Sequence, residues 1–445
     1  MRRILLVLLS FALFAPLAWA DVRPESADLI ALATPTHQQT CLIKPTVADL
    51  PKRDLKCFCL TPDNRIVAGC AGGEGELRVF DDAGNYIESW SAPFEPEAIH
   101  VRADGVIFLA GEGQLARLSA DGQVELQQPA PHIAAMDQNL DKIRAEVIEQ
   151  NKRRGDVYTQ QVEQFDTMLE QIDTRIDALK EQIAAFDEPA EGSEAKDGSR
   201  PAASGRTRLP KQVLERQLAM QERMKEQYEQ VKSQYTEIAQ REKPQELTEE
   251  QIERQVQQSL KYKRQASSIS ATDDEVFLAT RAATGYGFEV WKMDTDFVGG
   301  EKIISGLSGC CGQMDVKANG DGLFVAENSR HRVCRYDRDG KLIGQWGQGA
   351  RKGIEGFGSC CNPMNVAFGP DGVVYTAEDN TGRIKRYSPE GELLGLVGAS
   401  KLVPGCKNVS IAVNNDGSRV YMLDITPGHI VRMDPYAPGE APVPT

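Results

Sequence analysis

Two short stretches of this sequence place adjacent cysteines at the same position of a repeated pattern. Residues 308–316 read Ser-Gly-Cys-Cys-Gly-Gln-Met-Asp-Val, and residues 358–366 read Gly-Ser-Cys-Cys-Asn-Pro-Met-Asn-Val. In each stretch the second cysteine lies ten residues before the aspartate of an Asp-Gly turn, and Cys406 lies ten residues before Asp416. If the repeated units pack around a common centre, thiols at the same position of each unit should lie close together there. Such a group could bind a soft metal ion, because soft ions prefer thiolate ligands.

Three kinds of chemistry are open to these thiols. A metal centre would hold an iron–sulfur cluster, zinc or copper through converging thiolates. Disulfide bonds are the second possibility, because ten cysteines form an even set and exported proteins commonly oxidise theirs. A redox-active or substrate-binding pair of adjacent thiols is the third. The candidate disulfides join Cys57 or Cys59 to Cys41 or Cys70, and the candidate redox pairs are Cys310–Cys311 and Cys360–Cys361.

The N-terminal residues have the pattern of a Sec-type signal peptide. Arg2 and Arg3 precede an apolar run from Ile4 to Leu17, and Ala18-Trp19-Ala20 forms an A-x-A cleavage site. The run is shorter than the ~18 apolar residues that a spanning helix needs. We therefore predict cleavage after Ala20, a periplasmic or secreted protein, and no transmembrane segment in the mature chain.

The overall charge excludes one class of function. The chain of 445 residues carries 51 Lys and Arg against 65 Asp and Glu, a formal net charge of −14. Nucleic-acid-binding proteins need clustered positive charge, so we predict no nucleic-acid partner.

Most of the chain alternates short apolar segments with Asp-Gly or Asp-Ala-Gly turns, which indicates repeated antiparallel strands. Units begin near residues 57, 96, 267, 310, 360 and 406. A period near 40 residues with four strands per unit is typical of a β-propeller. The last unit has three strands, so we expect segment 40–50 to supply the fourth.

The stretch from Cys360 to Gly398 resembles an NHL repeat, and residues 314–347 resemble it too, with Asn328-Ser-Arg-His-Arg-Val333 and Gln345-Trp346-Gly347. This resemblance implies an all-β, six-bladed β-propeller. Propellers of this kind include binding scaffolds, lyases and lactonases. The lyases use a ring of histidines, which is not visible at equivalent positions here.

In such a propeller, the loop before the first strand of each blade opens at one end of the central channel. We therefore expect six thiols near that end as candidate metal ligands: Cys311, Cys361, Cys406, Cys310, Cys360 and Cys70. The alternative is a metal-dependent hydrolase or lyase that uses carboxylates in the channel. Its candidate residues are the aligned acids Glu327, Glu378 and Asp424.

Residues 133–265 belong to another structural class. From Val162 to Phe186 the apolar residues are spaced alternately three and four apart, and a similar seam runs from Met224 to Ile238. Residues 188–206 have the composition of a flexible tip, and Thr248 to Gln251 form a capping box before a last short helix. We predict an antiparallel coiled-coil hairpin that binds a protein partner through residues 137–262. The alternatives are a dimerisation element and a hairpin that only spaces or rigidifies the fold.

Together these patterns predict five regions: a signal peptide (1–20), an N-terminal segment with blades 1 and 2 (21–132), the coiled-coil insertion (133–265), blades 3 to 6 (266–436) and a Pro-rich tail (437–445). The predicted function is that of an exported, non-enzymatic binding or scaffold protein. Its cysteine cluster would hold a metal centre, and its coiled coil would engage the partner. The disulfide-stapled interaction module and the propeller enzyme remain the alternatives.

Overall fold

The structure is a computed structural model that describes residues 31–187, 210–241, 247–320, 322–350, 353–403, 405 and 407–440, without the side chains of 154–156. The predicted signal peptide, the predicted flexible tip at 188–206 and Cys406 lie outside the described residues. The chain divides into two compact units. The first contains Met1–Ala134, Arg264–Ala282 and Tyr286–Thr445, and the second contains Ala135–Lys263 and Ala283–Gly285.

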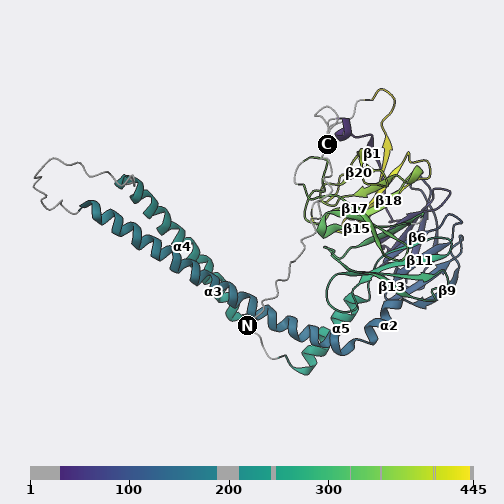
Figure 1. Cartoon of the computed structure of the whole chain (residues 1–445). Coiled ribbons are helices and arrows are strands. Elements are labelled where there is room, and N and C mark those ends of the chain that lie inside the picture. The colour runs from purple at the N-terminus through teal and green to yellow at the C-terminus, as the bar shows by residue number, and fades with distance from the viewer. Residues whose placement is uncertain are drawn as a thin grey trace, which may run out of the picture. The chain divides into compact units, whose positions relative to one another are not determined.

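The first unit consists of four-stranded antiparallel sheets, and all but the last are formed by strands that follow one another in the chain (Figure 1). The first sheet contains β2 (Asp54–Leu60), β3 (Ile66–Ala71), β4 (Glu76–Phe80) and β5 (Tyr86–Ser91). The second contains β6 (Ala98–Val101), β7 (Ile107–Gly111), β8 (Gln114–Leu118) and β9 (Val124–Pro129). The third contains β10 (Ala266–Ala271), β11 (Glu275–Arg281), β12 (Phe288–Asp294) and β13 (Glu301–Leu307).

Two further sheets follow the same order. The fourth contains β14 (Asp315–Asn319), β15 (Gly322–Glu327), β16 (Arg332–Asp337) and β17 (Leu342–Trp346). The fifth contains β18 (Asn365–Phe368), β19 (Val374–Ala377), β20 (Arg383–Tyr387) and β21 (Leu393–Ala399). Short 3-10 turns occur at Asn328–Arg330 and Pro370–Gly372.

The sixth sheet joins the two ends of the chain. It contains β22 (Val409–Val413), β23 (Val420–Asp424), β24 (His429–Pro435) and, from the N-terminal segment, β1 (His37–Ile43). β1 pairs antiparallel with β24, with His37 opposite Pro435 and Ile43 opposite Ile430. The prediction that the N-terminal segment completes the last sheet is confirmed, with the strand at 37–43.

The first strands of the sheets contact one another in sequence, from β2 through β6, β10, β14 and β18 to β22, and β22 contacts β2. Side chains connect several of these strands, because the Asp315 carboxylate accepts the Val366 N–H (2.8 Å) and the Asn365 side-chain oxygen accepts the Ile411 N–H (2.7 Å). Six four-stranded antiparallel sheets in this order fit a six-bladed β-propeller.

Burial along each sheet explains why the central strands have continuous apolar sequences. All six residues of β3 and of β15 are buried, whereas Trp90 is the only buried residue of β5. Apolar residues of neighbouring sheets pack face to face, as Val79 of the first sheet and Leu109 of the second do in one cluster. Burial of apolar area on both faces of the second strands is the main stabilising contribution to such a fold.

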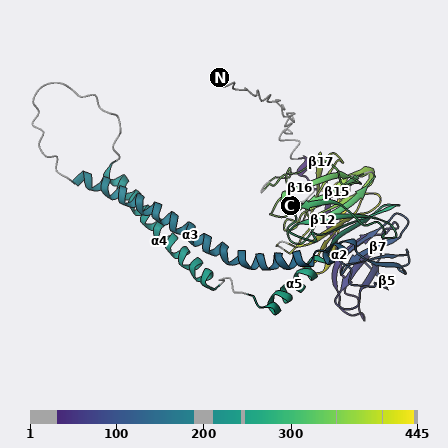
Figure 2. The ribbon, with the colours of Figure 1, turned by 60° about the horizontal axis from the view of Figure 1, so that its bottom comes forward.

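The second unit is helical. α2 (Pro131–Asp137) leads into α3 (Leu140–Asp187), which α4 (Lys211–Arg241) and α5 (Glu249–Lys263) follow. α3 and α4 lie side by side in both views (Figures 1 and 2), with the Phe165 ring 6.1 Å from that of Tyr228 and 5.4 Å from that of Tyr235. Because Asp173 pairs with Lys225 while Lys180 pairs with Glu222, the two helices run antiparallel.

The predicted start of the last helix is also found. The Thr248 N–H donates to Gln251 Oε1 (2.8 Å), and the Gln251 N–H donates to Thr248 Oγ1 (3.3 Å). This reciprocal pair is a capping box. None of the described helices combines the length and apolar character required to cross a membrane.

Candidate metal centre

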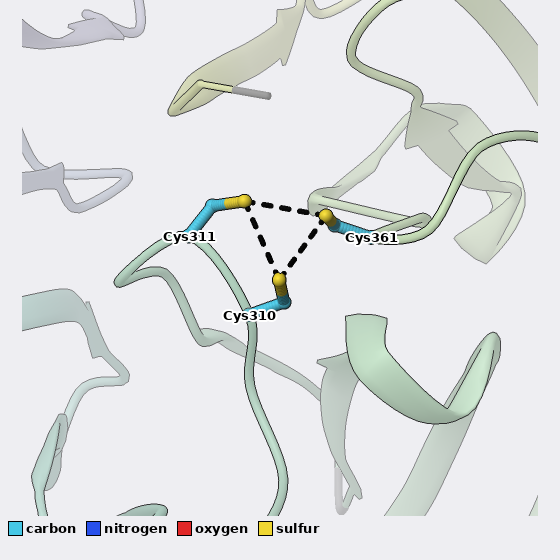
Figure 3. A group of neighbouring side chains, drawn as sticks. All are labelled: Cys310, Cys311 and Cys361. Carbon is cyan, nitrogen blue, oxygen red and sulfur yellow. Dashed lines mark hydrogen bonds between the residues drawn. The ribbon is translucent and has the colours of Figure 1, made fainter. Parts of the chain in front are cut away.

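Two loops carry the paired cysteines, and each lies immediately before the first strand of a sheet. Cys310 and Cys311 precede β14, and Cys360 and Cys361 precede β18. The side chains of Cys310, Cys311 and Cys361 point toward one another from the two loops (Figure 3). Their Sγ atoms all lie within 4.8 Å of one another, an arrangement that can hold a metal ion.

Cys361 lies at the centre of the sulfur contacts. Its Sγ is 3.2 Å from that of Cys310, 3.2 Å from that of Cys311 and 3.0 Å from that of Cys360. The Sγ atoms of Cys310 and Cys311 are 3.5 Å apart. A disulfide bond requires about 2.05 Å, and within the described residues no two cysteine sulfurs lie at that distance.

The four thiols differ in their access to solvent. Cys361 is 0% exposed, Cys310 and Cys311 are partly buried, and Cys360 is exposed. Cys310, Cys311 and Cys361 belong to one apolar cluster with residues of the fifth and sixth sheets, including Met364 and Val409. Low solvent access strengthens electrostatic interactions in the cluster, so a bound cation would interact strongly with the thiolates.

The first loop is held by the last residue of β15 and by the residue that follows it. Glu327 accepts the Ser308 N–H (2.8 Å). Asn328 accepts the Cys310 N–H (2.7 Å) and donates to the Cys310 carbonyl (3.3 Å) and the Gln313 carbonyl (3.1 Å). Both anchoring side chains are 0% exposed, so the bonds that fix the backbone of Cys310 are shielded from water.

The second loop is held in an equivalent way. Glu378 accepts the Gly358 N–H (3.2 Å). Asn362 donates to the Gly358 carbonyl (2.8 Å) and to Asp379 Oδ1 (2.9 Å), and its own oxygen accepts the Asp379 N–H (2.8 Å). The bond between Asn362 and Gly358 spans the Cys360–Cys361 pair and closes this loop. His331 Nδ1 lies 3.1 Å from the Asn362 carbonyl, so this histidine also contacts the loop.

The three aligned acids, which sequence analysis considered as channel ligands, are each paired with basic side chains. Glu327 is bound by Arg330 (2.9 Å) and Arg332 (2.5 Å). Glu378 is bound by Arg383 (2.7 Å) and Lys385 (2.9 Å).

The third of these acids completes the pattern. Asp424 is bound by Lys407 (2.9 Å) and accepts the Val403 N–H (2.9 Å). All three carboxylates therefore anchor the loop that precedes the first strand of their own sheet, and their charge is already compensated.

The cysteine loops contain residues in the left-handed backbone region. Cys311 has a φ of 55°, Gly312 a φ of 78° and Ser359 a φ of 64°. For residues other than glycine this conformation costs about 1–2 kcal/mol. Cys311 and Ser359 therefore carry backbone strain, and they lie in the loops that bring four sulfurs together. Backbone strain of this kind is common at functional sites.

A positive charge lies beside the first loop. A methyl group added at Gly312 would meet Nη2 of Arg281 at 2.6 Å, so the guanidinium lies against the turn that follows Cys311. Its central carbon also lies over the Phe288 ring, 5.3 Å from the ring centroid.

The remaining cysteines occupy other settings. Cys70, a predicted ligand, lies on β3 in an apolar cluster with Ile43, Leu55 and Phe58, and is not in the three-thiol group. Its Sγ lies 3.6 Å from the Ala68 carbonyl. Cys406, the other predicted ligand of the third loop, lies outside the described residues.

Burial changes the acidity of the cysteines outside the site. Desolvation raises the pKa of Cys57 and of Cys59, and it raises that of Cys70 to about 12 and that of Cys334 to about 11. The structure places neither Cys57 nor Cys59 at bonding distance from Cys41 or Cys70.

Sequence analysis missed the polar residues that shape the loops: Asn328, Asn362 and Asp379. A signal for two of them was present, because Ala326-Glu327-Asn328 and Ala377-Glu378-Asp379 occur at the same place in two repeats. When an acid followed by an amide or by a second acid recurs at the same place in two repeats, the recurrence indicates that these residues have the same structural role in both repeats.

Comparisons with known proteins concern the fold alone. No protein-family model and no curated protein matches this sequence. Among solved structures, streptogramin B lyase is similar at 10% identity, covering 89% of this chain and 98% of its own, with a TM-score of 0.42. The WD40 β-propeller domain of Doa1 has 6% identity, coverage of 89% and 96%, and a TM-score of 0.39.

A protein of unknown function from Bacteroides thetaiotaomicron has 7% identity, coverage of 91% and 74%, and a TM-score of 0.44. At these TM-scores the likenesses carry no argument about ligands or activity. The propeller assignment rests on the six sheets and the contacts of their first strands, and the NHL resemblance remains an expectation from the sequence.

Proposed function

We propose that this protein is an exported β-propeller that binds a single soft metal ion through the thiolates of Cys310, Cys311 and Cys361. The observation that carries the proposal is the meeting of these three sulfurs, all within 4.8 Å of one another, from two separately anchored loops. Anchored loops hold the ligands in place before the metal binds, which lowers the entropic cost of binding.

Sulfur spacing favours one ion over an iron–sulfur cluster. A single tetrahedral ion with metal–sulfur bonds of about 2.3 Å separates its sulfurs by about 3.8 Å. The Sγ distances from Cys361 to Cys310 and to Cys311 are 3.2 Å, so small outward movements would produce this geometry. A cluster instead places its cysteines on different iron atoms and requires wider spacing.

Among single ions, copper(I) suits this site best. The ligand group consists of sulfur alone, and copper(I) is favoured by thiolates and thioethers. Met364, 0% exposed, packs in the same cluster, and its Sδ lies 3.4 Å from the Asn328 amide nitrogen that also bonds to the Cys310 carbonyl.

The enzyme alternative has less support. A hydrolase or lyase centre would need carboxylates available to a divalent cation. Glu327, Glu378 and Asp424 are each 0% exposed and each paired with Arg or Lys. Moving Glu378 or Asp424 to a cation would leave the buried side chain of Lys385 or Lys407 without its counter-charge, which costs several kcal/mol.

We further propose that the helical unit engages a protein partner. Several of its apolar side chains are exposed, including Ile148 (44%), Val157 (50%) and Met220 (60%). His132 Nε2 lies 3.1 Å from the Arg264 carbonyl, so the two points where the chain leaves and re-enters the sheet unit are adjacent.

Replacing residues 137–262 by a short Gly-Ser linker should therefore retain metal binding and abolish partner binding. Loss of metal binding in the linker variant would contradict the proposal that the sheet unit binds the metal and the helical unit binds the partner.

The metal proposal is tested on the full chain expressed with its export signal and purified without oxygen. Elemental analysis after loading with copper(I) should give one ion per chain, and X-ray absorption should show sulfur neighbours only. Iron with an iron–iron scattering path would instead establish a cluster, and no bound copper would refute the proposal. N-terminal sequencing of the purified protein tests export, with Asp21 expected as the first residue.

A further inference from the structure

We propose that Cys360 is the exchange thiol through which copper(I) enters the site and leaves it for a thiolate-bearing acceptor. This inference rests on the proposed function, because it assigns a role to the sulfur at the edge of the same site. It makes the protein a metal donor or acceptor rather than a permanent holder. It follows from the order of solvent access among the four thiols and from the way the second loop fixes that order.

The thiols form a path from solvent to the buried site. Cys360 is exposed, and its Sγ lies 3.0 Å from the Sγ of Cys361, which is 0% exposed. Cys361 is in turn 3.2 Å from both Cys310 and Cys311. Cys360 thus contacts the central ligand while lying outside the three-thiol group.

The outward position of Cys360 is built into the loop. Gly358 is held on one side of the cysteine pair by Glu378, and Asn362 is held on the other side by Asp379. The bond from Asn362 to the Gly358 carbonyl (2.8 Å) ties these two points together. Ser359, with its φ of 64°, turns the chain immediately before Cys360. In this closed loop Cys361 is buried and Cys360 is exposed.

Ligand exchange at copper(I) needs no oxidant or reductant. The Cys360 thiol loses its proton as its sulfur bonds to the ion, and the ion then releases one of the inner sulfurs, which takes up a proton. Acceptor thiols next bind the ion one after another and displace Cys360 and the two remaining inner sulfurs, and each displaced sulfur takes up the proton that the incoming thiol loses. Copper stays in the +1 state throughout. Soft thiolate ligands on the acceptor match the preference of the ion.

The test uses the full chain, reduced and loaded with one equivalent of copper(I) without oxygen. Stopped-flow absorbance follows transfer to an excess of bathocuproine disulfonate, and equilibrium competition gives the affinity. Cys360→Ser should keep one copper ion with an affinity within about threefold of the native chain, and should transfer it at least tenfold more slowly. Cys41→Ser is the control, because Cys41 is also partly exposed but lies on β1 with its Sγ near the Ala83 carbonyl (3.8 Å).

The outcomes separate this inference from the proposed function. If Cys360→Ser holds copper and transfers it at the native rate, Cys360 is not the exchange thiol. If Cys360→Ser loses the ion, Cys360 is a permanent ligand and the inference also fails, while the metal site itself stands. If the native chain binds no copper(I), the proposed function fails together with the inference. Cys360→Ala repeats the measurement in case the serine hydroxyl binds the ion.

Discussion

The same residue type has two contrasting settings in this protein. Cys57 and Cys70 lie within strands β2 and β3, inside apolar clusters where burial raises their pKa values. Cys310 and Cys361 lie in loops, where their sulfurs approach to 3.2 Å. A strand fixes its side chains in the packing between sheets, whereas a loop anchored at both ends can turn two sulfurs toward each other.

This contrast shows that the anchors, rather than the cysteines alone, define the site. Glu327 and Glu378 hold Ser308 and Gly358, and Asn328 holds the backbone of Cys310 on both sides. Cys70 has no such loop and packs as a small apolar residue, as buried cysteines commonly do. If this interpretation is right, substitutions in the two settings should have clearly different effects.

The largest difference is expected in metal affinity. Cys361→Ser removes the sulfur that contacts three others, and should weaken copper(I) binding by a factor of at least ~1,000, because an alcohol is a poor ligand for a soft ion. Cys57→Ser changes a buried thiol away from the site and should leave the affinity unchanged. Competition titration against a copper(I) chelator measures both. Equal losses of copper(I) affinity in the two variants would mean that the loop cysteines and the strand cysteines do not differ in metal binding.

Thiol reactivity should show the next largest difference. At pH 8 only a small fraction of Cys334 and Cys70 is thiolate, because their pKa values are about 11 and about 12. Exposed Cys360 should therefore react with iodoacetamide at least ~100-fold faster than either one in the reduced, metal-free chain. Peptide mass spectrometry over time gives the rates. Rapid alkylation of Cys334 in the folded chain would contradict its buried setting.

The pH dependence of the buried thiols has a definite sign. Because the folded-state pKa of Cys334 lies above that of an unfolded cysteine, its alkylation rate should rise about tenfold per pH unit until about pH 11. The same shift stabilises the fold below the unfolded pKa, and this contribution is lost as the pH rises toward 11. Denatured protein, in which all thiols should react at similar rates, serves as the control.

Much of the fold could be predicted because its signals are local. Apolar segments between Asp-Gly turns indicated the strands. The last unit was one strand short of four, which indicated that the N-terminal segment would complete it, and β1 does so by pairing with β24. Apolar spacing of three and four residues indicated α3 and α4, and Thr248 with Gln251 indicated the start of α5. Each of these inferences depends on residues close together in the chain.

The site could be predicted only in part. The equal register of Cys311 and Cys361 indicated that they would meet, and their sulfurs do, at 3.2 Å. Cys70 was expected nearby because its strand returns to the same end of the sheet, but its side chain packs between sheets. The direction of a side chain depends on tertiary packing that a repeat pattern does not encode. For the same reason the acids were considered as ligands, although Arg332 and Arg383 compensate two of them.

A smaller effect is expected when an anchor is removed and the cysteines are kept. Asn328→Ala deletes the bonds to the Cys310 N–H and carbonyl and to the Gln313 carbonyl. Leaving such buried groups unpaired should cost about 1–3 kcal/mol of stability, and metal affinity should fall because Cys310 is no longer held. Asn319→Ala, on the far end of β14, is the matched control. Urea unfolding and copper titration measure the two effects, and unchanged affinity would mean that Asn328 supports the fold alone.

The smallest difference in copper(I) affinity is expected between two glycine variants, which separate the effect of backbone strain from the contribution of Arg281. Gly312 and Gly320 both have positive φ values, 78° and 56°, but a methyl group at Gly312 would meet Arg281 Nη2 at 2.6 Å, while one at Gly320 would meet nothing within 4 Å. Alanine at either position should therefore cost about 1–2 kcal/mol of stability through the left-handed backbone. Only Gly312→Ala should also lower copper(I) affinity, by several-fold, because its methyl group would meet the Arg281 side chain and disturb the turn that follows Cys311. Because the backbone cost is common to both variants, the difference in affinity between them reports the effect of that contact on the site. Equal affinities in the two variants would assign Arg281 to packing against Phe288 and leave the sulfurs and their backbone anchors as the whole of the metal site.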